Sequence, residues 1–119
     1  EGWEDVTYYT EKKYGLYADQ GEGDQWVYIL SNPSLPKEYL KIGYTKLKPE
    51  ERAIQISSAT GVPTPYKVEW AYKCFNGEIV ERMTHQKLKA FRVNNKKEFF
   101  HISLEEAKDN IILIGNKFK

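Results

Sequence analysis

The sequence predicts a small α+β domain, in which an antiparallel or mixed β-sheet of three to four strands is flanked by helices in the order β-β-α-β-α-β-α. Three observations predict this fold class. Short runs rich in Val, Ile, Tyr and Trp are typical of strands. Longer segments between them carry helix start signals or apolar residues at helical spacing, and clusters of Gly, Pro and Asn separate the segments. The length of 119 residues suits one domain with one modest core.

The first half of the domain is expected to hold a hairpin, a helix and a third strand. Strands are predicted at 26–30 and 39–44, and the connection of about eight residues between them suggests a hairpin with a long loop. A helix is predicted from Pro49 to about Ser58, because proline favours the first helical position and two glutamates follow it. Residues 67–73 alternate polar and apolar side chains, which indicates a half-buried strand.

The second half is expected to hold two helices and a short strand. A helix is predicted at 78–92, then a polar loop at 93–97 and a strand at 98–101. The sequence Ser103-Leu104-Glu105-Glu106 has the pattern of a capping box, so it predicts the start of the last helix. Gly115 is expected to end that helix.

Charge divides the chain into two parts. Residues 1–25 carry seven acidic and two basic residues, a balance of −5, together with several aromatic residues. Residues 26–119 carry the remaining sixteen basic and ten acidic residues, a balance of +6. We therefore expect an acidic, aromatic N-terminal arm at 1–25 and a basic domain at 26–119. A basic domain suits a polyanionic partner, but the same excess also describes an ordinary solvated lysine surface.

Cysteine content and hydropathy restrict the class of protein. Cys74 is the one cysteine of the sequence, so a disulfide framework and a cysteine-based zinc site are excluded. No apolar run approaches the ~20 residues that span a bilayer, so no membrane partner is expected. These features favour a reducing compartment, and we expect the protein in the cytoplasm.

The first two strands and the helix after them carry side chains suited to phosphate chemistry. Tyr28 lies on the first expected strand, and Lys41 and Tyr44 lie on the second. Neighbouring antiparallel strands can place such side chains on one face. Arg52 falls one turn inside the following helix, where an arginine fork can grip a phosphate at two points. Taken singly, each residue also has an ordinary interpretation as core packing or as a solvated surface group.

A polar stripe lies on the second expected helix. Glu78, Glu81 and His85 stand at i, i+3 and i+7, so they share one helix face. The stripe offers a carboxylate to a hard cation and an imidazole to proton transfer, although it also fits a plain polar helix face. The candidate set has neither a Ser-His-Asp arrangement nor a glycine loop for a nucleotide. It therefore suits phosphodiester chemistry better than acyl transfer or nucleotide hydrolysis.

Several motifs within residues 26–110 resemble the GIY-YIG nuclease superfamily, in a branch found largely in phage and bacterial proteins. The two signature tripeptides are similar to Val27-Tyr28-Ile29 and Lys41-Ile42-Gly43, with Val27 in place of glycine and Lys41 in place of tyrosine. The other matching features are Arg52 on the following helix, the proline-rich block at 49–66, Glu81 with His85, and Glu98-Phe99-Phe100.

The resemblance implies a metal-dependent endonuclease that hydrolyses phosphodiester bonds in DNA with Mg²⁺, or Mn²⁺, as its cofactor. It implies that Glu81 binds the metal and that Arg52 neutralises charge on the phosphate in the transition state. Tyr28 would take the proton from the attacking water or orient that water. Lys41 would lower the pKa of Tyr28 or act as a base itself, and Tyr44 or His85 would complete a proton relay. Asn95, or its neighbour Asn94, is a weaker candidate for a structural or phosphate-positioning amide, and Glu98 is either a second acidic contact or a structural anchor. Lys46 and Lys48 are further candidates for contact with DNA.

The alternative from another class is a nucleic-acid-binding module of the same fold that does not cut, and a structural piece of a phage or mobile-element protein is a third interpretation. The expected partner is DNA, without a small-molecule cofactor, and a further domain outside this chain would supply sequence specificity. Under the resemblance, the compartment is the cytoplasm of a bacterium or of a phage-infected host. The sequence leaves open DNA against RNA, nicking against double-strand cutting, and the oligomeric state.

Overall fold

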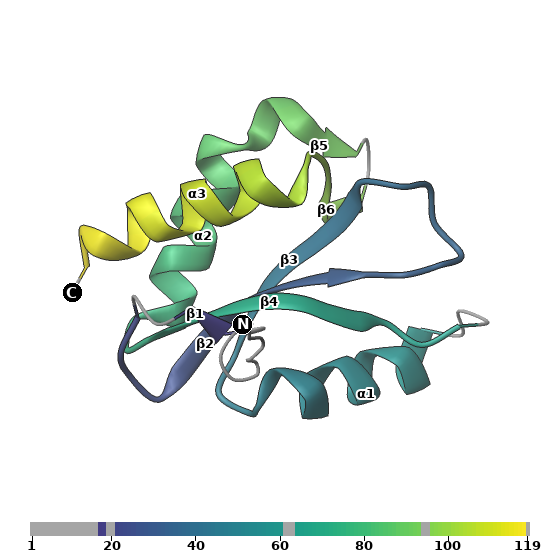
Figure 1. Cartoon of the computed structure of the whole chain (residues 1–119), viewed down its shortest axis with the longest axis horizontal. Coiled ribbons are helices and arrows are strands. Elements are labelled where there is room, and N and C mark those ends of the chain that lie inside the picture. The colour runs from purple at the N-terminus through teal and green to yellow at the C-terminus, as the bar shows by residue number, and fades with distance from the viewer. Residues whose placement is uncertain (1–16, 19–20, 61–63, 94–95, 119) are drawn as a thin grey trace, which may run out of the picture.

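A six-stranded sheet with helices on both faces makes up the protein in its computed structural model, which describes residues 17–18, 21–60, 64–93 and 96–118 (Figure 1). The strand order is β1-β4-β2-β3-β6-β5, and only the pair of β1 and β4 is parallel. The strands are β1 Tyr17–Ala18, β2 Gln25–Ser31, β3 Tyr39–Thr45, β4 Lys67–Cys74, β5 Arg92–Val93 and β6 Lys96–His101.

This architecture confirms the α+β class. The four strands of six to eight residues, β2, β3, β4 and β6, are those that the sequence predicts, and the two-residue strands β1 and β5 extend the sheet at its edges. Tyr17 and Ala18 of the expected N-terminal arm pair with β4. Residues 1–16 and 19–20 of the arm lie outside the described residues. The division into an arm and a domain therefore stays a prediction.

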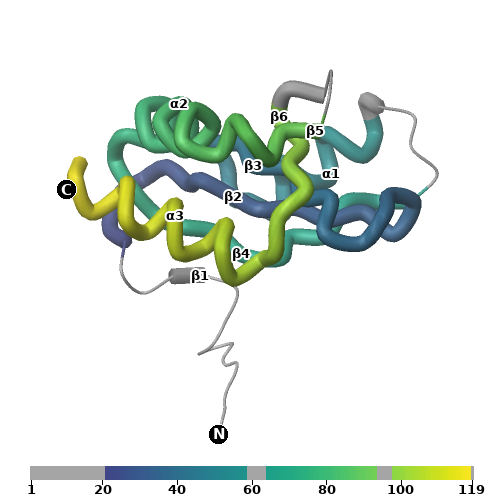
Figure 2. Tube along the Cα trace, turned by 90° about the horizontal axis from the view of Figure 1, so that it is seen from above, coloured from purple at the N-terminus to yellow at the C-terminus, as the bar shows by residue number. Residues whose placement is uncertain are grey.

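Three helices cover the two faces of the sheet. The helix α1, Pro49–Thr60, packs on one face, whereas α2, Gly77–Lys87, and α3, Leu104–Asn116, lie side by side on the other (Figures 1 and 2). A 3-10 turn, η1 Lys89–Phe91, follows α2. Among the described residues, no helix combines the length and the apolar character needed to cross a bilayer.

The central strand β2 is apolar on both sides because both of its faces are covered. Val27 and Ile29 point into the core shared with α2 and α3, whereas Tyr28 and Leu30 point into the smaller core under α1. All four side chains are buried. A strand buried on both faces carries a continuous apolar run, so the alternating pattern is seen less clearly here than in β4. Tyr28 is thereby fixed on the α1 face.

Two predicted boundaries are wrong, both for reasons of tertiary contact. The second helix ends at Lys87, and the expected polar loop begins with a strand, because Arg92 and Val93 pair with β6. Gly115 does not end α3, which continues to Asn116. A Cβ added at Gly115 would lie 2.6 Å from Cζ of the Tyr72 ring, so this glycine allows the helix to approach β4 closely. Tertiary packing, not a helix stop, explains the residue.

The start of α3 agrees with the predicted capping box in its main hydrogen bond. Ser103 is the N-cap residue, and its Oγ accepts from the backbone N–H of Glu106 at 3.2 Å. The Ser103 hydroxyl in turn donates to Oε1 of the Glu106 carboxylate at 3.3 Å. Such a cap satisfies a backbone donor that the first helical turn leaves unpaired. The helix is thus anchored directly after β6.

Candidate active site

The second half of β3 has an open edge on the side of β6. β6 pairs with β3 only at Tyr39, Leu40 and Lys41, although β3 continues to Thr45. Buried backbone groups need hydrogen-bond partners. Side chains from α2 supply these partners to the open edge, which gives the site its geometry.

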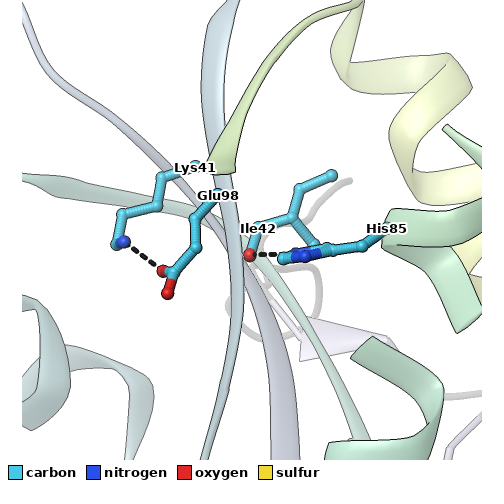
Figure 3. A network of polar contacts seen from close by, with 4 residues as sticks. All are labelled: Lys41, Ile42, His85 and Glu98. Carbon is cyan, nitrogen blue, oxygen red and sulfur yellow. Dashed lines mark hydrogen bonds and ion pairs between the residues drawn. The ribbon is translucent and has the colours of Figure 1, made fainter. Parts of the chain in front are cut away.

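Two residues of α2 hydrogen-bond to this open edge. His85 Nε2 lies 2.7 Å from the carbonyl oxygen of Ile42 (Figure 3), and the backbone N–H of Tyr44 donates to the Glu81 carboxylate. Glu81 and His85 stand four residues apart, which places them on one face of the helix. A carbonyl oxygen only accepts, so Nε2 of His85 carries the proton and Nδ1 remains an acceptor.

Tyr28 lies over Gly43 on the α1 face of the sheet. The two residues are direct partners in the ladder between β2 and β3. A Cβ added at Gly43 would lie 2.6 Å from Cζ of the Tyr28 ring, far inside normal carbon contact. Glycine at this strand position is therefore needed for the ring to pack against the backbone of β3.

The Tyr28 hydroxyl meets Arg52, which α1 places over this face. The Arg52 side chain hydrogen-bonds to the hydroxyl, and its Nη1 also donates to Gln55 Oε1 at 3.1 Å. Burial raises the pKa of Tyr28 to about 12; the bond to Arg52 opposes this, and the charges of Glu98 and Glu81 add to it. With only 2% of Tyr28 exposed, the phenol keeps its proton at neutral pH.

Lys41 forms an ion pair with Glu98. The Lys41 side chain is 12% exposed, the Glu98 side chain is 47% exposed, and the two point toward each other beside β3 (Figure 3). Lys41 Nζ also lies 5.3 Å from the centre of the Phe99 ring, a favourable cation–π distance. The expected lowering of the Tyr28 pKa by Lys41 is not found. Arg52 is the cation that lowers it, and burial outweighs that effect.

The Glu81 carboxyl group has a strongly raised pKa. Burial, followed by the charge of Glu98, raises the pKa of Glu81 to about 7, while the N–H of Tyr44 and the charge of Lys41 act in the opposite direction. Desolvation is the main cause that lowers the pKa of His85, so its imidazole is neutral at pH 7. An acid and a base with perturbed pKa values side by side are typical of functional sites.

The structure brings six of the predicted residues together at the open edge of β3, and we call this group the edge cluster. Glu98 acts electrostatically on three of them, Tyr28, Glu81 and His85, so the group behaves as one electrostatic unit. The members come from five different elements. They are Tyr28, Lys41, Arg52, Glu81, His85 and Glu98.

A single hydrated divalent cation fits the edge cluster. No three His, Cys, Asp or Glu side chains in the described part of the chain form a ready-made metal cage. Mg²⁺ keeps several waters and needs only one or two carboxylates. Glu81, whose pKa is raised partly by the neighbouring charge of Glu98, is a carboxylate that a cation would stabilise in its charged form. Glu81 would hold the metal, with Glu98 nearby.

The remaining predicted residues lie elsewhere. The Tyr44 ring is on the opposite face of the sheet from Tyr28, beside Gly77, and only its backbone N–H reaches the edge cluster. Lys46 and Lys48 are exposed in the turn before α1. Glu78 is exposed, and its Oε2 lies 3.6 Å from Nη2 of Arg82; its charge contributes weakly to the raised pKa of Glu81. Asn94 and Asn95 lie outside the described residues.

Two contributors to the site were not predicted. Gln55 holds the Arg52 guanidinium from one helical turn away, and Gly43 makes room for Tyr28. The signal for Gly43 was present, because a glycine inside a strand often marks the close approach of another group. Nothing in the sequence around Gln55 separates it from the other polar residues on the surface of α1.

A family model matches the chain over most of its length. It is described as the T5orf172 domain and matches residues 25–115, which is 91 of the 119 residues. This is a phage-associated domain related to nuclease-like folds. Neither the search of curated proteins nor the search of solved structures gave a match.

Proposed function

The chain belongs to the T5orf172 domain family, and we propose that it is a metal-dependent endonuclease of the GIY-YIG type that hydrolyses phosphodiester bonds in DNA. The family itself points to a nuclease or DNA-binding role. The observation that carries the more specific proposal is the edge cluster, where a buried tyrosine bonded to arginine adjoins a glutamate of raised pKa and a neutral histidine.

Arg52 is the residue we assign to the scissile phosphate. A guanidinium has five N–H donors, and the bonds to Tyr28 and Gln55 use only part of them. The remaining donors can form charge-assisted bonds to a phosphate without any change at α1. Because Tyr28 and Gln55 hold the group in advance, little reorganisation is needed when charge builds on the phosphate.

Tyr28 is assigned to orienting the attacking water. Its pKa of about 12 makes the phenolate rare at neutral pH, so the neutral hydroxyl serves as a hydrogen-bonding group. The hydroxyl accepts from Arg52, which leaves its own proton free to bond to water. Because the Glu81 carboxylate is assigned to the metal, Nδ1 of His85 is the group of the edge cluster that can accept a proton near neutral pH.

Lys41 and Glu98 form an ion pair beside Tyr28 whose partners can change when substrate binds. The ion pair is partly exposed, so a phosphate oxygen can compete with Glu98 for the Lys41 ammonium. When bound at Glu81, Mg²⁺ or Mn²⁺ supplies a Lewis acid for the phosphate and the leaving oxygen. If a phosphate oxygen replaced Glu98 as the partner of Lys41, the Glu98 carboxylate would be free to turn toward the cation at Glu81. The charge of Glu98 already acts on Glu81.

The test is incubation with supercoiled plasmid in Mg²⁺, in Mn²⁺ and in EDTA. We expect nicked or linear products in either metal and none in EDTA. Arg82→Ala is a matched control, because Arg82 is an exposed arginine of α2 whose described ion pair is with Glu78 rather than with the edge cluster. Full activity in EDTA would contradict a metal-dependent mechanism.

A binding module that does not cut is the second candidate. It is favoured by one observation: Glu81 and His85 both hydrogen-bond to the backbone of β3, which is a structural task that a non-cutting protein would also need. Such a module would bind DNA with strong dependence on salt and would leave plasmid intact in both metals.

A further inference from the structure

A small hollow lies beside the edge cluster, between the end of β3 and the start of α2. Its volume is about 190 Å³, and it is lined by Tyr44, Lys46, Phe75, Glu78, Ile79 and two amide side chains. This is below the ~300–1,000 Å³ of sites for drug-sized ligands. The hollow therefore suits one small planar group rather than a whole cofactor.

Phe75 presents an exposed aromatic ring at this hollow. Its side chain is 61% exposed, although phenylalanine is usually buried, and it follows directly after β4. The Tyr44 ring adds a second aromatic surface, and the exposed Lys46 adds positive charge. Aromatic side chains beside cations are the combination that holds unpaired bases and their phosphates.

The hollow is tied to the edge cluster through Tyr44 and α2. The ring of Tyr44 lines the hollow, while its backbone N–H donates to Glu81. On α2, Glu78 lines the hollow and Glu81 lies three residues later, a separation of about 5 Å. The hollow lies on the α2 face of the sheet, whereas Tyr28 and Arg52 lie on the α1 face, so a DNA strand would pass the open edge of β3 between the phosphate position and the hollow.

We propose that this hollow binds one unstacked nucleobase of the substrate strand, with Phe75 stacking on its face. The inference rests on the proposed function only for the position of the phosphate. Two amides offer hydrogen bonds to the base edge: Gln25 Oε1 accepts from Gly77 N, which leaves its amide N–H groups, and Asn76 Nδ2 donates to Phe118 O, which leaves its Oδ1. The substrate class is DNA with an unpaired or readily unpaired base on the strand that is cleaved.

The experiment measures binding in EDTA, so that cleavage does not interfere. The probes are two duplexes of one sequence, one with a single unpaired 2-aminopurine and one fully paired. The parent protein should bind the unpaired probe more tightly and quench its fluorescence by stacking. Phe75→Ala should lose the quenching and weaken that complex about 5- to 150-fold, the range for one base–aromatic stack, while affinity for the paired duplex stays unchanged.

Matched variants separate stacking from other roles of Phe75. Phe75→Trp should retain quenching and affinity, whereas Phe75→Leu, which keeps apolar area without a ring, should lose both. Phe91→Ala truncates another exposed phenylalanine, 43% exposed, and should change neither. Because Phe75 is largely exposed, its truncation leaves both cores intact, which thermal melting checks.

Three results would overturn the inference. One is equal affinity of Phe75→Ala and the parent for the unpaired probe. Another is a Phe75→Leu variant that retains full quenching and affinity, which would indicate a general apolar contact. The third is a parent dimer that Phe75→Ala dissociates without any change in DNA affinity, which would make the surface a contact between copies. Plasmid cleavage by the parent in Mg²⁺ is measured in parallel, because intact plasmid would contradict the proposed function without changing the result of the binding experiment.

Discussion

Gly43→Ala tests whether the fit of Tyr28 against β3 creates the site. The added Cβ would lie 2.6 Å from Cζ of Tyr28, whereas carbon atoms pack at about 3.5–4.0 Å. The ring must therefore move by roughly 1 Å. Tyr28 is buried and its hydroxyl is held by Arg52, so this movement must disturb the bond to Arg52 or the neighbouring side chains.

Two effects of known size follow from this movement. Overpacking of a filled core costs about 1–3 kcal/mol, which lowers the Tm of a domain of this size by roughly 5–15 °C. A displacement of about 1 Å in a positioned catalytic group can cost about 10²-fold in rate. We therefore expect Gly43→Ala to lose cleavage far beyond its loss of folded protein.

Gly115→Ala is the matched control for this experiment. Its added Cβ would lie 2.6 Å from Cζ of Tyr72, the same overlap, but Tyr72 belongs to the core on the other face of the sheet. Both variants are compared by thermal melting and by plasmid cleavage at a temperature where both are folded. We expect similar losses of Tm and a loss of cleavage only in Gly43→Ala. Unchanged stability and cleavage in Gly43→Ala would refute the reasoning.

Three further predictions concern the charges of the edge cluster. Glu81→Gln should abolish Mn²⁺ binding in calorimetric titration, because the amide keeps the shape but not the charge; unchanged binding would place the metal elsewhere. The pKa of Glu81 is raised from 4.5 to about 7, so the folded protein binds a proton more tightly than the unfolded chain does. The resulting stabilisation is complete below pH 4.5 and is lost as pH rises through 7, so urea melts in EDTA should show lower stability at pH 8 than at pH 5, and Glu81→Gln should reduce that difference. Glu98→Gln should lower the pKa of the Glu81 carboxyl group in an NMR titration, since Glu98 is the main charge that raises it, and an unmoved titration would contradict this coupling.

The sequence was most informative where local signals and tertiary packing agree. Pro49 begins α1, and the Ser103 cap begins α3. The alternation of polar and apolar side chains at 67–73 predicts β4, which ends one residue later. In each case the side chain that signals the element also acts within a few residues of it, so no distant contact was needed for the prediction.

Residues whose roles depend on distant contacts were predicted less well. Gly115 has the usual features of a helix stop, but its role is set by Tyr72, 43 positions earlier in the chain. Arg92, at the end of the predicted helix, and Val93, at the start of the predicted loop, form β5 because β6 offers an edge. Local propensity is a weak guide where such pairing decides the structure.

The candidate site shows the same division. Tyr28, Lys41, Arg52, Glu81 and His85 were predicted as a group, and the structure places them around one strand edge. The pairing of Lys41 with Glu98, instead of an effect on Tyr28, depends on where β6 leaves β3. That geometry follows from the sheet topology, which the pattern of residue types does not predict.

Cleavage of supercoiled plasmid in Mg²⁺ by the parent and by Arg52→Ala, with Arg82→Ala as the control, tests the central claim most directly. Arg52 bonds to Tyr28 and adjoins the proposed phosphate position, whereas Arg82 pairs with Glu78 on the surface. We predict that the parent and Arg82→Ala cut at similar rates and that Arg52→Ala is slower by about 10²–10³-fold at equal Tm. Cleavage by Arg52→Ala within threefold of the parent, or intact plasmid with the parent in both Mg²⁺ and Mn²⁺, would contradict the account.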